Sequence, residues 1–197
     1  MKKIMFNDKY GLTQAVLEGR KTQTRRIIPK DFFSLTWDKR DDTLVYENSM
    51  GDFIDIRNSK YALCKAGEIV AVAQSYRDCG GVNEEGIPMW EIISSKVGGT
   101  NAGWSNKMFV RAELMPHYVI ITAVSVERLR DISDVDCMAE GINYYEQEGF
   151  SWCSTGKLFD TPREAYAALI DKVSGKGTWE RNPYVFVYDF ELVKKWK

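Results

Sequence analysis

The longest strand pattern in the chain constrains the fold most, because alternation over many residues commits a segment to a sheet. Residues 108–129 predict a long strand that Pro116 interrupts. Beyond the proline, even-numbered side chains from 118 to 126 would share one face and the odd-numbered ones the other. A second alternating segment, rich in aromatic residues, covers 184–193, and residues 68–76 predict a buried strand. These segments favour a sheet of antiparallel strands.

Three helices are predicted from apolar periodicity and from the residues at their ends. The first covers residues 8–18. The second is short and begins after Ser133. The third has the clearest signals, because Thr161 is a good N-cap, Pro162 fits the first helical position and Glu164 can complete a capping box. Strands together with separate helices predict an α+β fold.

Residues 19–26, GRKTQTRR, place four cations and two hydroxyls in eight positions. Their alternation predicts an extended strand with Lys21 and Arg25 on one face and Thr24 and Arg26 on the other. At a bulged strand start, Lys21 could still turn toward Thr24. A lysine beside a threonine hydroxyl can act as its base if the lysine pKa is lowered, and arginines suit phosphate or carboxylate. The alternative is a solvated basic edge strand, which composition alone favours.

Charge is unevenly distributed although the net charge is −1. Residues 1–30 contain eight cations and two acids, a balance of +6. Residues 131–150 contain six acids and no lysine or arginine, a balance of −6. The two segments are expected to attract each other, either simply docking or enclosing a cleft that holds a carboxylate near the basic stretch.

The four cysteines and the single histidine, His117, lack the spacing of metal ligands, so no metal site is predicted. Four cysteines in 197 residues do not indicate a disulfide framework. No apolar run is long enough to span a membrane, and the first residues lack the apolar core of a signal peptide. These features predict a cytoplasmic protein with reduced thiols and no membrane partner.

The stretch at 19–26 resembles the signature of the ASCH domain family, a relative of the PUA RNA-binding domains. Further blocks extend the likeness in family order at residues 65–70, 124–133, 139–142 and 182–190. Together the blocks resemble the larger ASCH proteins often found in phages and prophages. The resemblance implies a PUA-like, partly open β-barrel with a cleft between the barrel and the first helix.

A single domain is therefore expected over residues 1–197, with about six strands and about three flanking helices. Residues 30–64 and 77–106 match no part of the family pattern and are predicted to be insertions. The first insertion contains a predicted polar hairpin at 36–58. The second is rich in glycine and predicts a long loop or lid that carries Trp104.

Some ASCH proteins are amidohydrolases that remove the acetyl group from N4-acetylcytidine with a lysine, a threonine and a glutamate. Matched motif by motif, these residues are Lys21, Thr24 and Glu140. The resemblance implies that Lys21 deprotonates Thr24, whose oxygen attacks the amide carbonyl, while Glu140 holds the base or transfers a proton. No cofactor is expected. Otherwise Glu140 is an exposed acid at the end of a short helix, where the helix dipole disfavours its charge.

The competing expectation is a binding module without turnover, whose partner is RNA or a modified nucleoside. Its basic cleft would lie between residues 19–26 and the segment around Glu140. The candidate contacts are Arg20, Arg25, Arg26, Lys107 and Arg111 for phosphate, and Trp104 for stacking on a base. A third possibility is a phage protein-interaction module, which would expose aromatic loops without a polar cleft. The oligomeric state stays open.

Overall fold

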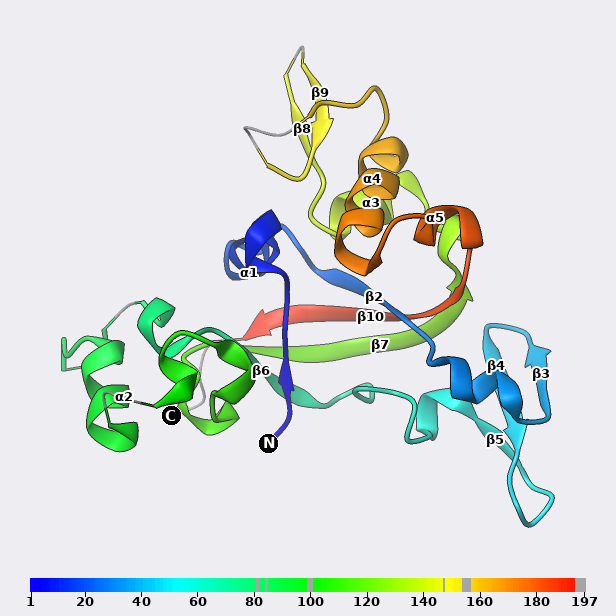
Figure 1. Ribbon diagram of the computed structural model, residues 1–197, viewed down its shortest axis with the longest axis horizontal. Helices are drawn as coiled ribbons and strands as arrows, with labels where there is room; N and C mark the ends of the chain where they lie inside the picture. Colours follow the sequence, from blue (N-terminus) through cyan, green and yellow to red (C-terminus); the bar gives the residue numbers. More distant parts are fainter. Residues whose placement is uncertain (81, 84, 99–100, 147, 154–156, 194–197) are drawn as a thin grey trace.

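A central β-sheet flanked by helices and two small sheets organises the computed structural model of this chain (Figure 1). The structure describes residues 1–80, 82–83, 85–98, 101–146, 148–153 and 157–193. Five α-helices and ten strands are assigned within these residues. The predicted α+β class is confirmed.

The central sheet has five strands in the order β1-β6-β7-β10-β2. Their bounds are β1 Lys3–Ile4, β6 Ile69–Val72, β7 Tyr118–Arg128, β10 Tyr184–Val193 and β2 Gln23–Ile27. β1 runs parallel to β6, and every other pair is antiparallel. The two long alternating segments pair as β7 and β10, with one register shift at Asp189. Among the described strands β1 and β2 remain edges, so backbone pairing does not close the sheet into a ring.

The predicted strand at 108–129 begins later than expected, at Tyr118. The preceding residues instead form two short 3₁₀ turns, Lys107–Phe109 and Ala112–Leu114. Val110, Ala112 and Met115 from this stretch are buried in a small second core, whereas Met108 and Phe109 are exposed. The prediction of a strand before Tyr118 is therefore wrong, because turns rather than regular alternation place the buried residues here.

The predicted hairpin at 36–58 is confirmed and has one strand more than expected. β3 Trp37–Arg40, β4 Thr43–Glu47 and β5 Phe53–Asp55 form an antiparallel sheet of three strands. A second small sheet pairs β8 Asn143–Tyr145 with β9 Gly149–Ser151. Figure 1 shows both small sheets projecting away from the central one.

The glycine-rich segment at 77–106 is not the uninterrupted loop that its composition predicts. It contains α2, Met89–Val97, which lies on the second core. Ile93 is the buried residue of this helix, and Tyr76 and Cys79 are buried in the same core. A single buried position gives little periodic signal, which explains why the helix is hard to recognise in the sequence.

The other helices are α1 Leu12–Leu17, α3 Asp134–Ala139, α4 Pro162–Ser174 and α5 Thr178–Arg181. α1 is shorter than predicted, because Gly11 adopts a left-handed conformation (φ 69°) and separates it from a 3₁₀ turn at Asp8–Tyr10. α3 begins with the predicted capping box of Ser133 and Asp136. In α4 the Thr161 hydroxyl accepts a hydrogen bond from the Glu164 N–H at 3.2 Å, as expected for its N-cap.

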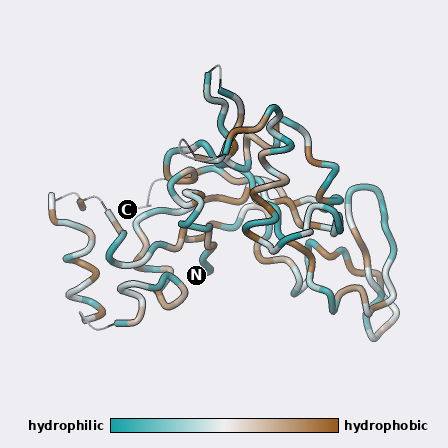
Figure 2. The backbone as a smooth tube through the Cα atoms, turned by 45° about the horizontal axis from the view of Figure 1, so that its top comes forward, coloured by the Kyte–Doolittle hydropathy of each residue, from teal (hydrophilic) through white to brown (hydrophobic). Residues whose placement is uncertain are grey.

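The main hydrophobic core lies between the central sheet and the segments that carry α1, α3 and α4. Figure 2 shows hydrophobic stretches interspersed with hydrophilic ones along the chain. Within the described ranges, no helix combines the length and the apolar character that a membrane crossing requires.

Replacing the cap of α4 tests whether the helix is anchored as described. Thr161→Ala should lower the free energy of unfolding by about 1 kcal/mol, because the first turn loses its side-chain acceptor. Thr161→Ser keeps that acceptor and should retain nearly all of the stability. Urea unfolding of the three proteins measures the difference, and equal losses in both variants would contradict the capping role.

Candidate functional site

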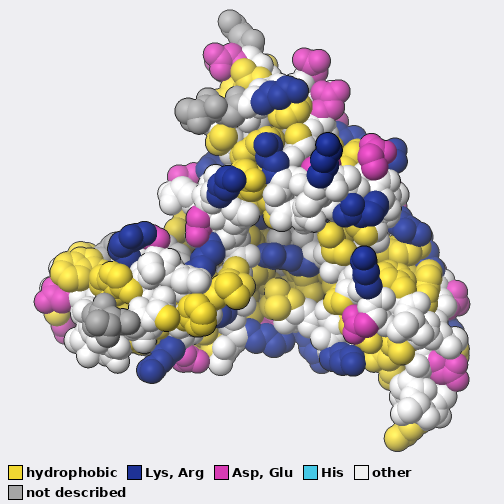
Figure 3. Space-filling model, viewed as in Figure 1, with side chains coloured by type: hydrophobic (Ala, Val, Ile, Leu, Met, Phe, Trp, Pro, Cys, Tyr) yellow, Lys and Arg dark blue, Asp and Glu magenta, His cyan; other side chains and the backbone are white. Residues whose placement is uncertain are grey.

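A cavity of about 670 Å³ lies where edge strand β2 meets the segment after β1 and the C-terminal half of α4. Polar residues and cations line it together with apolar ones: Met5, Phe6, Asn7, Asp8, Lys9, Leu12, Lys21, Thr24, Arg25, Arg26, Ile27, Lys107, Glu140, Tyr166, Leu169, Ile170, Val173 and Ser174. Figure 3 shows a hollow near the centre of this face, with Lys and Arg side chains in and around it. The cavity therefore joins segments from both ends of the chain.

Lys21 lies at the buried end of this cavity and is 2% exposed. Its Nζ donates to the backbone oxygens of Gln23 and Glu140, each at 2.8 Å, and to the Glu140 carboxylate. An ammonium group has three N–H donors, so all three are used. Lys21 therefore joins the start of β2 to the end of α3.

Local backbone geometry brings these two segments together. The chain leaves α1 through Gly19, and the N–H of Lys21 donates to the Ala15 oxygen at 3.0 Å. The next N–H, of Thr22, donates to the Ala139 oxygen at 2.9 Å. Glu140 is the C-cap of α3, so this contact places its side chain beside Lys21. The interpretation of Glu140 as an exposed acid is wrong, because it is 5% exposed.

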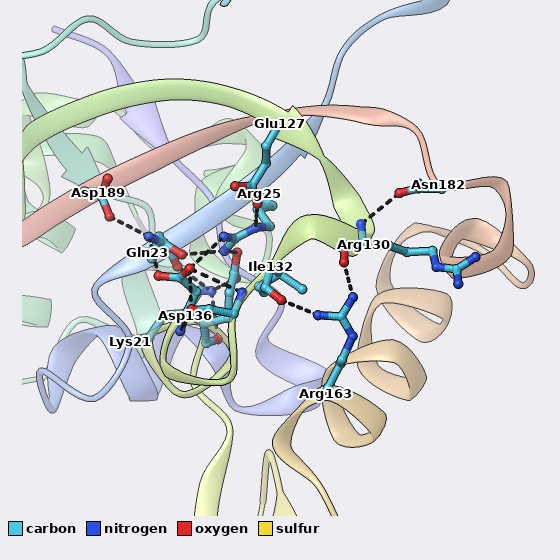
Figure 4. A network of polar contacts seen from close by, with 12 residues as sticks. Lys21, Gln23, Arg25, Glu127, Arg130, Ile132, Asp136, Arg163, Asn182 and Asp189 are labelled. Atoms are coloured by element: carbon cyan, nitrogen blue, oxygen red, sulfur yellow. Dashed lines mark hydrogen bonds and ion pairs between the residues drawn. The ribbon is translucent and has the colours of Figure 1, made fainter. Parts of the chain in front are cut away.

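Arg25 is buried beside the same carboxylate and contacts three acids. Its Nε lies 2.7 Å from Glu127 Oε1, its Nη1 3.3 Å from Glu140 Oε1, and its Nη2 3.6 Å from Asp136 Oδ2. Figure 4 shows these side chains converging from β2, β7 and α3. The prediction that Arg25 contacts phosphate is not supported, because its guanidinium is already paired inside the protein.

Burial and charge shift the pKa values of this cluster in opposite ways. Burial lowers the pKa of Lys21 below its usual 10.5, while the Glu140 carboxylate acts in the opposite direction. The pKa of Arg25 is raised; burial alone would lower it, but the neighbouring carboxylates outweigh that effect. Burial raises the pKa of Glu127 despite the nearby guanidinium. Lys21 is thus the cation in the cluster that can most readily lose a proton.

Thr24 and Arg26 lie on the opposite face of β2 from Arg25, as the sequence predicted. Thr24 is 4% exposed and lines the cavity. Among the described residues, no hydrogen bond joins Thr24 to Lys21 or Glu140, although all three line one cavity. The Arg26 guanidinium lies 5.8 Å from the centre of the Phe6 ring, and its Nη2 donates to the Met5 oxygen.

The remaining predicted contacts divide into one that lines the cavity and three that do not. Lys107 lines it, and its Nζ lies 2.7 Å from Asp8 Oδ2. Arg20 is exposed and pairs with Glu18 outside the cavity. Arg111 is exposed and Trp104 packs on the second core, so neither contributes to the site.

Sequence reasoning missed the residues that make one wall of the cavity. Tyr166, Leu169, Ile170 and Val173 come from α4, and Phe6 comes from the segment after β1. Their apolar periodicity predicts a buried helix face, but periodicity does not show what that face covers. The position of α4 over β2 is set by tertiary packing, which the periodicity of the helix does not reveal.

No family model, curated protein or solved structure matches this chain. The described residues also contain no cluster of three or more His, Cys, Asp or Glu side chains that could hold a metal ion. The chemistry of the site is therefore inferred from its own side chains.

The buried ion cluster should be sensitive to the loss of its shared carboxylate. Glu140→Gln should lower the free energy of unfolding by about 3 kcal/mol, because two buried cations lose a counter-charge. Glu18→Gln, at an exposed pair, should leave stability nearly unchanged. Denaturant unfolding at neutral pH compares the two variants. Equal small effects would show that Glu140 does not hold the cluster together.

Proposed function

We propose that the cavity binds RNA or a modified nucleoside, with a base inside and phosphate at the rim. The observation that carries this proposal is the composition of the cavity: a polar, charged end, apolar walls and cations at its opening. Its volume of about 670 Å³ lies within the usual range of small-ligand pockets.

The walls suit a planar ring. Phe6, Leu12, Leu169 and Ile170 supply apolar surface on different sides of the cavity. A base that enters between them would exchange water for apolar contact on its faces, while its polar edge would meet Thr24 and the Lys21–Glu140 pair. A base can reach such a site from a single strand or by flipping out of a duplex, and the single strand avoids the cost of unpairing.

The charge of the lining suits a phosphate. Five cationic side chains and two carboxylates line the cavity, a balance of +3. Lys21 and Arg25 are bound within the ion cluster and Lys107 is paired with Asp8, which leaves Lys9 and Arg26 as the cations for a ligand. Of these, Lys9 is exposed, and its Nζ lies 5.6 Å from the centre of the Tyr10 ring.

The resemblance to ASCH and PUA-like domains supports the same ligand class. We propose that the central sheet is the core of a PUA-like, partly open barrel. The contact between Arg26 and the Met5 oxygen supports this, because it brings the chain after one edge strand to the other edge. A cytoplasmic location is part of the proposal. The polar cavity favours this ligand over a phage protein-interaction role, for which exposed aromatic loops without a polar cleft are expected.

Binding should depend on salt and on Lys9. A labelled single-stranded RNA that carries one N4-acetylcytidine should bind more weakly as salt rises, because phosphate contacts release counterions. Lys9→Ala should weaken binding and reduce the slope of log affinity against log salt by about 1. Lys39→Ala removes an exposed lysine from β3, outside the cavity, and should change neither. Fluorescence anisotropy at several salt concentrations measures both effects.

Two outcomes would contradict this proposal. Equal effects of Lys9→Ala and Lys39→Ala would show that the cavity does not contact the phosphates. Binding of duplex RNA as tight as that of the single strand would contradict insertion of a base. Free N4-acetylcytidine, used as a competitor, separates a nucleoside site from an RNA site.

A second function, amide hydrolysis, is favoured by one observation: Lys21, with its lowered pKa, lines the same cavity as Thr24 and Glu140. Charged Lys21 has no free lone pair. After losing a proton it would have two N–H donors and one lone pair, so one of its three present contacts would be released. The amine could then accept the Thr24 proton while the threonine oxygen attacks an acyl carbonyl, and the resulting ammonium would return that proton to the leaving nitrogen as the C–N bond breaks. Water would then hydrolyse the acyl-threonine, releasing the acid and restoring the hydroxyl.

Hydrolysis of N4-acetylcytidine tests this second function. Cytidine release should rise with pH and level off below the ordinary lysine pKa, because burial lowers the pKa of Lys21 and its neutral amine becomes abundant earlier. Thr24→Val keeps the shape of the side chain without its hydroxyl and should abolish release while the nucleoside still binds. Chromatography of the products measures the rate. No release by the wild-type protein, with binding retained, would leave the binding function alone.

A further inference from the structure

Two buried donors at the cavity lack a partner within the protein. Among the described residues, four buried side-chain nitrogen or oxygen atoms have no hydrogen-bond partner: Arg26 Nε, Gln74 Oε1, Ser151 Oγ and the Tyr166 hydroxyl. Arg26 and Tyr166 line the same cavity. Buried polar groups are nearly always paired, so two unpartnered donors at one cavity call for a physical explanation.

Tyr166 is held independently of its hydroxyl. It is 2% exposed, and its ring packs edge-on against Trp179 with ring centres 6.2 Å apart. The phenol also remains protonated at ordinary pH, because burial and the nearby Glu140 charge raise its pKa well above 10. The ring fixes the position of the hydroxyl, which remains available as a donor.

Arg26 presents the second donor from the other side. Its Nη2 is bound to the Met5 oxygen and its guanidinium lies over Phe6, so the side chain is held in place. The Nε–H can only donate, because guanidinium has no acceptor. Together the two groups bring two hydrogen-bond donors to the cavity, and the Tyr166 oxygen can also accept one hydrogen bond.

We infer that Tyr166 and Arg26 are ligand-binding residues that donate hydrogen bonds to an acceptor of the bound base, such as a ring carbonyl oxygen. This inference rests on the proposed binding function. It specifies that a hydrogen-bond acceptor of the ligand faces Tyr166 and Arg26. A carbonyl oxygen has two lone pairs and accepts two donors at once. A ligand edge that carries only N–H groups could donate to the Tyr166 oxygen but would leave the Arg26 Nε–H unpaired, which disfavours such a ligand.

Tyr166→Phe tests the inference because it removes the hydroxyl and keeps the ring. The variant should bind the single-stranded RNA carrying N4-acetylcytidine on the order of tenfold more weakly, the effect of one lost hydrogen bond. Its unfolding midpoint should be equal to or higher than that of the wild type, because an unpaired buried hydroxyl is removed. Loss of affinity without loss of stability distinguishes a ligand-binding role from a structural one.

Tyr188→Phe is the matched control. The Tyr188 hydroxyl accepts a hydrogen bond from the Leu63 N–H at 2.8 Å and does not line the cavity. This variant should lose stability and keep its affinity.

Arg26→Lys keeps the charge but removes the Nε donor, so it should weaken binding. If both donors meet one atom of the ligand, the double variant with Tyr166→Phe should lose less binding free energy than the sum of the two single losses.

The outcomes separate this inference from the proposed function. Equal binding by the wild type and Tyr166→Phe would overturn the inference and leave the binding function intact. A lower unfolding midpoint in Tyr166→Phe would show that the hydroxyl has a partner inside the protein, which also overturns it. No binding by the wild-type protein would overturn both.

Discussion

The pairing of two buried cations with one carboxylate is the interaction on which this structure depends. Lys21, just before β2, and Arg25, within it, are both removed from water, and burying either cation would be costly without a counter-charge. Glu140 supplies that charge to both, one oxygen to each cation. The side chain can do so only if the end of α3 lies against the start of β2. The ion cluster therefore fixes how the helical layer sits on the sheet, and the cavity lies where the two meet.

The same cluster decides which cations remain for a ligand. The basic first 30 residues and the acidic segment at 131–150 do attract each other, as their opposite charges predict. Much of that attraction is satisfied inside the protein, through Arg25 with Asp136 and Glu140 and through Lys21 with Glu140. The basic stretch is consequently less available than its composition indicates. Because Lys21 and Arg25 are paired inside the protein, the proposed site is better suited to binding a single base than to contacting many phosphates along a nucleic-acid strand.

α4 changes the character of the cavity. This helix lies outside the blocks that resemble the ASCH pattern, yet it supplies an apolar wall and the Tyr166 hydroxyl. A cleft built from β2 and Glu140 alone would be polar throughout. With α4 above it, the cavity has a charged end and apolar sides. This combination suits the proposed ligand, a base with a polar edge and flat faces.

Local sequence signals predicted the fold class, the long alternating segments that form β7 and β10, and the caps of α3 and α4. These signals can be recognised from neighbouring residues, whereas Lys21, Thr24 and Glu140 were singled out by a resemblance to a family pattern. Tertiary packing sets which acids Arg25 contacts, keeps Arg20, Arg111 and Trp104 out of the cavity and brings Tyr166 to it. Those outcomes depend on which distant segments meet, and neither periodicity nor composition encodes the distance between residues more than a hundred positions apart in the chain.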